Sequence, residues 1–102
     1  MIVYGLDVVV LKRNGRREPF VPEKLVVSAM KSGAPPEIAR KIALIVTARL
    51  LENNVKEVSA RELTRWMLEL LKKENEEWYR NWIIFDRAVK RRRTEEELQR
   101  QA

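Results

Sequence analysis

The sequence predicts an α+β fold that is mainly helical: a four-helix bundle capped by a small antiparallel β-hairpin or three-stranded sheet. Two observations support this prediction. An unbroken aliphatic run from Val8 to Leu11 precedes Asn14-Gly15, the preferred two-residue hairpin turn, and a short return strand reaches Phe20. Beyond the hairpin, four segments carry apolar residues at helical spacing. A chain of 102 residues has room for one domain core.

The first two predicted helices are delimited by proline and glycine. Pro22 suits the first position of a helix, where its missing N–H costs nothing, and Gly33 supplies a stop. Pro35-Pro36 restarts the chain, and the apolar stripe of the second helix ends at Asn53-Asn54. These signals predict helices over about 22–32 and 36–52.

The third predicted helix begins with a capping box, and the fourth is rich in large apolar residues. Ser59 is followed three residues later by Glu62, a pairing that satisfies N–H groups at a helix start, and the helix ends near Glu74-Asn75. On the fourth helix, large side chains recur at steps of four, three and four and are expected to share one face. These residues are Trp78, Trp82, Phe85 and Val89.

Composition narrows the possible functions. Lys and Arg number 21 against 15 Asp and Glu, and the net charge of +6 favours anionic partners such as nucleotides, nucleic acid or acidic proteins. Cysteine and histidine are absent, which removes thiolate nucleophiles, cysteine-ligated zinc and the commonest general base. No segment is long and apolar enough to cross a bilayer or act as a signal peptide. We therefore expect a cytoplasmic binding protein, with neither enzymatic activity nor a membrane partner.

Four cations surround the hairpin turn: Lys12, Arg13, Arg16 and Arg17. Like charges placed this close repel, so an anion such as phosphate beside the hairpin would explain the sequence. The helix start at Pro22 follows directly and adds backbone donors that favour phosphate. The alternative is a charged hairpin that is simply solvated.

The order of motifs resembles the ATP-cone, the nucleotide-sensing regulatory domain of ribonucleotide reductases, and runs from about Val8 to about Arg92. The hairpin motifs are Lys12-Arg13, Asn14-Gly15, Arg16-Arg17-Glu18-Pro19-Phe20 and Pro22-Glu23-Lys24. Downstream motifs in the family's order lie at residues 33–37, 55–59 and 82–90. The resemblance implies residues 1–93 as an ATP-cone-like domain, with residues 94–102 as a C-terminal tail.

The resemblance also implies a nucleotide site. Residues that match Lys12, Arg13 and Lys24 contact the nucleotide in ATP-cones, mostly its phosphates, and the glutamate that matches Glu18 reaches the base. The Glu18 carboxylate could also pair across the strands with Lys12 or Arg13, and the two roles could alternate. Val21 departs from the family pattern, because many members have a polar, base-contacting residue there.

Further site residues are implied on the third and fourth helices. Polar contacts to sugar or phosphate lie near the start of the third helix in the family, and of the matching residues Ala60 and Thr64 only Thr64 retains a polar group. At the end of the fourth helix the family has a phosphate-binding lysine, for which Lys90 is the nearest match and Arg91 the alternative. A bound nucleotide could bring Mg²⁺ with it.

The leading hypothesis is a free-standing ATP-cone that binds ATP or dATP and thereby changes its self-association or its association with an unidentified protein. ATP-cones are otherwise fused to a reductase or to a zinc ribbon that binds DNA. The rival hypothesis is a small nucleic-acid-binding protein on an ATP-cone scaffold, with Arg87 and Lys90 to Arg93 on the phosphate backbone. Three tryptophans, Trp66, Trp78 and Trp82, could stack on bases, but helical spacing among aliphatic residues favours the core.

Overall fold

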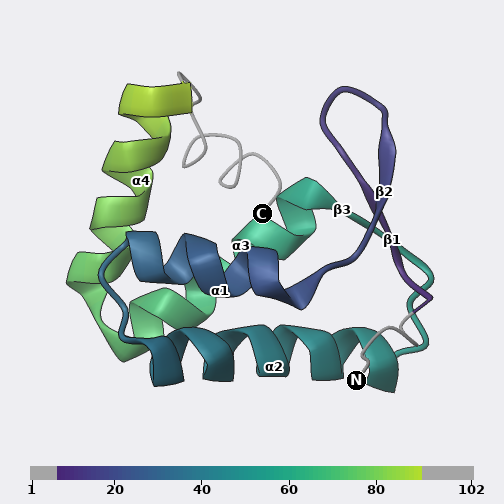
Figure 1. The fold of residues 1–102 in the computed structure, drawn as a ribbon, viewed down its shortest axis with the longest axis horizontal. Coiled ribbons are helices and arrows are strands. Elements are labelled where there is room, and N and C mark those ends of the chain that lie inside the picture. The colour runs from purple at the N-terminus through teal and green to yellow at the C-terminus, as the bar shows by residue number, and fades with distance from the viewer. Residues whose placement is uncertain (1–6, 91–102) are drawn as a thin grey trace.

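A computed structural model of the chain describes residues 7–90, with side chains described as far as Asp86. The elements are β1 (Val9–Leu11), β2 (Arg17–Pro19), α1 (Pro22–Lys31), α2 (Pro36–Glu52), β3 (Glu57–Ser59), α3 (Ala60–Glu74) and α4 (Glu76–Lys90) (Figure 1). Four helices against three short strands confirm the predicted α+β, mainly helical class.

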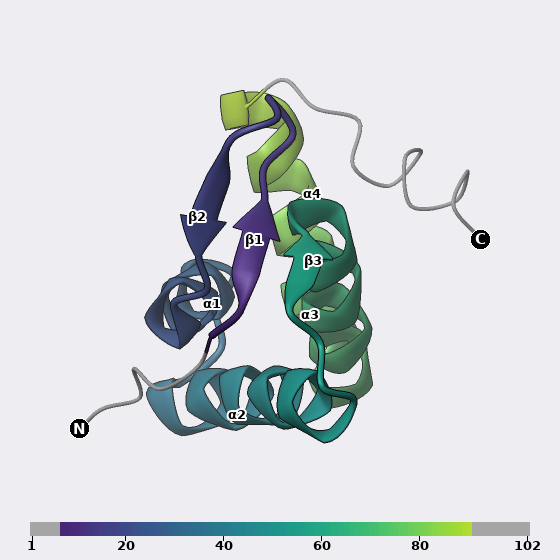
Figure 2. The same cartoon turned by 90° about the vertical axis from the view of Figure 1, so that its right-hand side faces the viewer.

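The sheet is mixed, with the strand order β2-β1-β3. β1 pairs antiparallel with β2, as predicted for the hairpin, but it pairs parallel with β3. The predicted hairpin is therefore present, and the third strand makes the sheet a mixed one. The chain travels through α1 and α2 between β1 and β3, and this crossover returns it in the same direction. In Figure 2 the strands stand above α2, with α1 below β2 and α3 continuing from β3.

The hairpin loop has three residues, so the predicted two-residue Asn14-Gly15 turn is wrong. The Gly15 N–H donates to the Lys12 carbonyl (3.0 Å), and the Lys12 N–H donates to the Arg16 carbonyl (2.8 Å). Arg13 and Asn14 are thus the central residues of the turn, and Gly15 follows with a φ of +88°. This is the turn-plus-glycine arrangement of three-residue hairpin loops. It sets Lys12 opposite Arg16 and leaves Arg13 in the loop.

The predicted helix ends are confirmed. Beyond α1, the Ala34 N–H donates to the Ala29 carbonyl, and Gly33 has a φ of +118°, which a residue with a side chain rarely adopts. Beyond α2, Asn54 takes the equivalent position with a φ of 52°. At the start of α3 the Ser59 Oγ accepts the Glu62 N–H at 3.0 Å, as the capping box predicts.

The core lies where the helices meet beneath the sheet. α1 packs along α2, while α3 contacts α2 and α4, and α4 also contacts α1. The largest fully buried apolar side chains are Ile42, Val46, Leu50, Met67, Leu68 and Leu71. In Figure 1, α4 crosses the direction of α1 and α2 rather than running beside them, so a regular four-helix bundle is not confirmed.

The buried face of α4 differs from the predicted one. Trp82 is buried as predicted, and Trp78 packs against the core, but Phe85 is 37% exposed. Ile83 and Asp86, one turn apart, are buried instead. Phe85 therefore lies at the edge of the apolar face, where the Lys31 ammonium is 5.9 Å from its ring centroid. Val89, the fourth residue of the predicted face, lies outside the described side chains.

Candidate functional site

The main pocket opens between β2 and the first turns of α1 and α3. Its volume of about 480 Å³ lies within the range of roughly 300–1,000 Å³ found for small-molecule sites. The lining residues are Val10, Lys12, Glu18, Pro19, Phe20, Val21, Glu23, Lys24, Leu25, Val27, Ser28, Ala60, Leu63 and Thr64. Five of the predicted nucleotide-binding residues therefore line one cavity: Lys12, Glu18, Val21, Lys24 and Thr64.

The strand register directs Glu18 toward this pocket. Val10 is paired with Glu18 on one side and with Val58 on the other, so the three side chains share one face of the sheet. Val10 and Val58 are buried, which identifies this face as the inner one. Lys12, two residues beyond Val10, belongs to the same face. The alternation of side chains along β1 and β2 thus brings a cation and a carboxylate to the helix side of the sheet.

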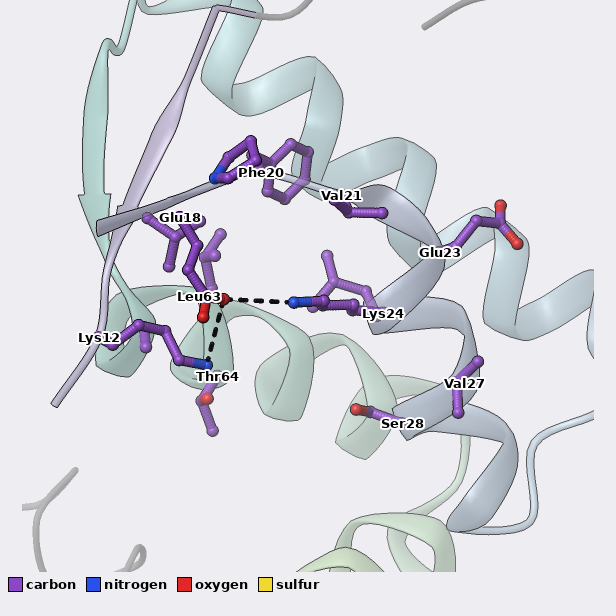
Figure 3. Close-up of a pocket in the computed structure, with 14 residues that line it drawn as sticks. Lys12, Glu18, Phe20, Val21, Glu23, Lys24, Val27, Ser28, Leu63 and Thr64 are labelled. Atoms are coloured by element: carbon purple, nitrogen blue, oxygen red, sulfur yellow. Dashed lines mark hydrogen bonds and ion pairs between the residues drawn. The ribbon is translucent and has the colours of Figure 1, made fainter. Parts of the chain in front are cut away.

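Glu18 is held between two lysines (Figure 3). Its Oε1 accepts a hydrogen bond from the Lys24 Nζ at 3.3 Å and lies 3.9 Å from the Lys12 Nζ. The hydrogen bond from Lys24 and the charge of Lys24, with smaller contributions from Lys12 and Arg16, hold the pKa of the Glu18 carboxyl below its ordinary value. The Glu18 carboxylate therefore lies between the two ammonium groups and partly neutralises their charge.

We expect the pKa of Glu18 to rise toward its ordinary value in Lys24→Gln and to rise less in Lys12→Gln, as measured by NMR of the carboxyl carbon. A folded-state pKa below the unfolded value of about 4.3 means that these pairs contribute stability above that pH. The contribution is lost as the pH falls through the lower folded-state pKa. Lys41→Gln, which removes a distant ion pair to Glu74, is the matched control. An unchanged Glu18 pKa in Lys24→Gln would contradict this assignment.

The rest of the pocket combines apolar walls with two helix starts. Phe20, Leu25 and Leu63 are buried, whereas Val21 is 39% exposed at the rim. Val21 is the N-cap residue of α1 but makes no side-chain capping bond. A ligand anion could therefore accept a hydrogen bond from the first turn of α1. Thr64 lies on α3 beneath Lys12 in Figure 3, with its side chain half-buried.

Arg13 does not line the main pocket. It lines a second, smaller hollow of about 250 Å³ together with Leu11, Lys12, Ser59 and Arg61. Lys12 is the residue that the two cavities share. Arg61 was not among the predicted site residues. No local pattern in the sequence indicated it, because Arg61 comes near the basic hairpin only through the pairing of β3 with β1.

The predicted site residues at the end of α4 lie at or beyond the last residue that the structure describes. Lys90 is the last residue of α4, and its side chain and that of Arg87 are outside the described part. Arg91 and the tail from Thr94 to Ala102 lie outside the described residues altogether. Their roles and the boundary at residue 93 stay predictions.

The tryptophans belong to the core, as predicted, and not to the pocket. Trp82 is 6% exposed, while Trp66 and Trp78 pack partly buried against the core residues. Within residues 7–90 there is no group of three or more Asp and Glu side chains placed to hold a metal ion. None of the helices in that range has the length and apolar character needed to cross a membrane.

Comparison with known proteins identifies the family. The ATP cone domain matches residues 8–91. The transcriptional repressor NrdR of Gloeobacter violaceus is 36% identical over 75 residues, which cover 70% of this chain and 44% of that protein. The transcriptional repressor NrdR of Microcystis aeruginosa is 33% identical over 78 residues, which cover 72% of this chain and 46% of that protein. The chain thus spans less than half the length of these curated relatives. Because the family match covers nearly the whole chain, the chain belongs to the ATP-cone family.

Proposed function

We propose that this chain is a nucleotide-sensing regulatory module that binds ATP or dATP in the main pocket. Family membership supports the class of ligand. The observation that carries the proposal is the convergence of Lys12, which follows β1, Glu18 on β2 and Lys24 on α1 on one cavity of about 480 Å³. Two ammonium groups match a phosphate chain, and a carboxylate matches the amino group of adenine.

Binding would exchange the partners of the two lysines. Phosphate oxygens would take the place of the Glu18 carboxylate beside Lys12 and Lys24, with a further N–H donor in the first turn of α1. Glu18, released from the lysines, would accept a hydrogen bond from the adenine amino group. Val21 at the rim would give the base an apolar contact. Any Mg²⁺ would be coordinated mainly by the phosphates.

Occupancy would act on the protein by joining separate elements. The pocket is lined by the hairpin, α1 and α3, so a bridging ligand would fix the hairpin against both helices. If the nucleotide binds one arrangement of these elements more tightly than another, its binding shifts the protein toward the first arrangement. We propose that this shift alters self-association or association with a partner protein. No turnover of the nucleotide is part of this function.

A second candidate, contact with nucleic acid, is favoured by the relatives. Two are named transcriptional repressors, and the charge of +6 suits a polyanionic partner. Arg87 and Lys90 to Arg93 are the residues proposed for this contact. Affinity for DNA or RNA that falls steeply with salt would support this candidate.

The proposal is tested by calorimetric titration with ATP, dATP, ADP and GTP, with the particle mass followed by light scattering at each end point. We expect ATP or dATP to bind more tightly than GTP, because the Glu18 carboxylate accepts from the adenine amino group. We also expect the mass distribution to change with occupancy. Failure of all four nucleotides to bind would refute the proposed function, and hydrolysis of ATP by the pure protein would refute a purely binding role.

A further inference from the structure

The outer face of α2 carries an apolar stripe that the rest of residues 7–90 leaves exposed. Leu44, Ala48 and Leu51 follow one another at steps of four and three residues, so they share one side of the helix. Leu44 is 63% exposed and Leu51 57%. The buried side chains of α2 lie on the opposite side: Ala39, Ile42, Ala43, Val46 and Leu50. In both Figure 1 and Figure 2, α2 lies along the base of the molecule. We name Leu44, Ala48 and Leu51 the α2 stripe.

We propose that the α2 stripe binds the same stripe of a second copy of this chain, with the two helices antiparallel about a two-fold axis. The inference assigns a surface to the self-association in the proposed function, but it does not require that a nucleotide binds. None of the residues that line the main pocket belongs to α2. Association through this face and nucleotide binding can therefore be measured separately.

The spacing within the stripe suits a two-fold contact. Leu44 lies four residues before Ala48, and Leu51 lies three residues after it. An antiparallel second copy therefore places each Leu44 opposite a Leu51. The small Ala48 side chain is at the centre, where it allows the two helices to approach closely. Single exposed leucines are common on protein surfaces, whereas this aligned pair forms a surface that is complementary to itself.

Charges beyond the two ends of the stripe favour the antiparallel direction. Glu37 lies seven residues before Leu44 on the same side of α2, and Lys56 lies four residues beyond the end of the helix. Both side chains are exposed, and neither forms an ion pair within residues 7–90. An antiparallel pair brings Glu37 of each copy toward Lys56 of the other. A parallel pair would bring like charges together, which is unfavourable.

The contact is small, so the dimer is expected to be weak. Each copy contributes two leucines, one alanine and one charged side chain at either end of the stripe. Such a contact is smaller than the roughly 1,200–2,000 Å² buried in stable complexes and is typical of transient association. We expect a monomer–dimer equilibrium with a dissociation constant in the micromolar to millimolar range.

The first test measures the mass of the ligand-free chain by sedimentation equilibrium at increasing protein concentration. The wild-type mass is expected to rise toward that of a dimer, whereas Leu44→Glu/Leu51→Glu should remain a monomer. Its melting temperature at low concentration should be unchanged, because both leucines are largely exposed in the monomer. Ile84→Glu is the matched control, since Ile84 is 64% exposed on a different helix, and it should dimerise like the wild type.

Three outcomes of this test would overturn the proposal. The first is a wild-type chain that stays monomeric at millimolar concentration. The second is an equal loss of dimer in Ile84→Glu, which would mean that apolar exposure anywhere drives association. The third is a lower melting temperature of Leu44→Glu/Leu51→Glu at concentrations where the wild type is monomeric. That result would show that another segment of the same chain covers the α2 stripe.

The second test uses the charges to establish the direction of the two helices. Glu37→Lys and Lys56→Glu each place like charges at both ends of the dimer, so each variant alone should dimerise about tenfold more weakly. An equimolar mixture restores opposite charges at both ends of the mixed dimer and should recover the wild-type affinity. Glu77→Lys is the matched control, because it reverses an acidic residue in the first turn of α4 instead of α2.

The mixture and the nucleotide titration separate the two proposals. A mixture of Glu37→Lys and Lys56→Glu that dimerises no better than either variant alone would overturn the antiparallel contact. All these variants should bind ATP as tightly as the wild type, because the main pocket does not include α2. If the wild-type chain binds no adenine nucleotide, the proposed function fails, while the mass measurements on the ligand-free chain still decide the α2 contact.

Discussion

Simultaneous replacement of Lys12 and Arg13 by alanine is expected to reduce the affinity for ATP by about 100-fold or more while the domain stays folded. Lys12 lines both cavities, and Arg13 lines the smaller one. A hydrogen bond to a charged group typically contributes about 1.5–3 kcal/mol, so the loss of two corresponds to at least two orders of magnitude in the dissociation constant. Arg13 is exposed and Lys12 only half-buried at the surface, so the core should be unaffected. Calorimetry and thermal melting measure the two quantities.

The matched control is Arg16→Ala with Arg17→Ala. It removes the same charge from the same hairpin, but Arg17 pairs with Glu57, and neither arginine lines either cavity. The affinity for ATP is expected to fall only a few-fold in this control, because two positive charges are removed from the hairpin. This difference should shrink as added salt screens the remaining charges. Equal losses in the two double variants would show that the hairpin attracts nucleotide by charge alone. Unchanged binding in Lys12→Ala/Arg13→Ala would refute the site.

Leu50→Ala is expected to lower the free energy of unfolding by about 2–5 kcal/mol, the usual range for a buried leucine. Leu50 is 0% exposed and lies in the last turn of α2, among the core side chains. Removing it leaves a cavity in a domain whose total stability is expected to be about 5–15 kcal/mol. Urea unfolding followed by circular dichroism measures the loss.

Leu51→Ala, one residue further along α2, is the natural comparison. This leucine is 57% exposed, and alanine is the better helix former, so the change should stay within about 0.5 kcal/mol. The two variants remove the same atoms from adjacent positions. Similar losses in both would mean that the core does not lie where the structure has it.

Local sequence signals were enough for most of the fold. Pro22, Gly33 and Ser59 begin or end helices through contacts with their near neighbours, and such signals can be read from the chain. The direction of β3 could not, because parallel pairing depends on how α1 and α2 return the chain to β1. The buried face of α4 was also predicted wrongly, since Phe85 was expected on it and the polar residue Asp86 is fully buried instead.

As with the fold, most but not all of the residues that line the candidate site could be predicted from the sequence. The resemblance pointed to Lys12, Glu18, Val21, Lys24 and Thr64, and these five line one cavity. The resemblance did not indicate that Lys12 lines the main pocket while Arg13 does not. This difference follows from the three-residue loop and from the alternation of side chains along the strand. The resemblance also missed Arg61, whose approach to the hairpin depends on a strand pairing between distant segments.

The parallel pairing of β1 with β3 also governs the order in which the site can form. Leu11 meets Ser59 only after residues 12–58 have closed into a long loop, a step that carries an entropic cost until the helices within it have packed. An isolated hairpin is at best marginally stable. A peptide containing only the basic turn would therefore have no binding site, and a bound nucleotide would slow unfolding of the entire domain rather than of one corner.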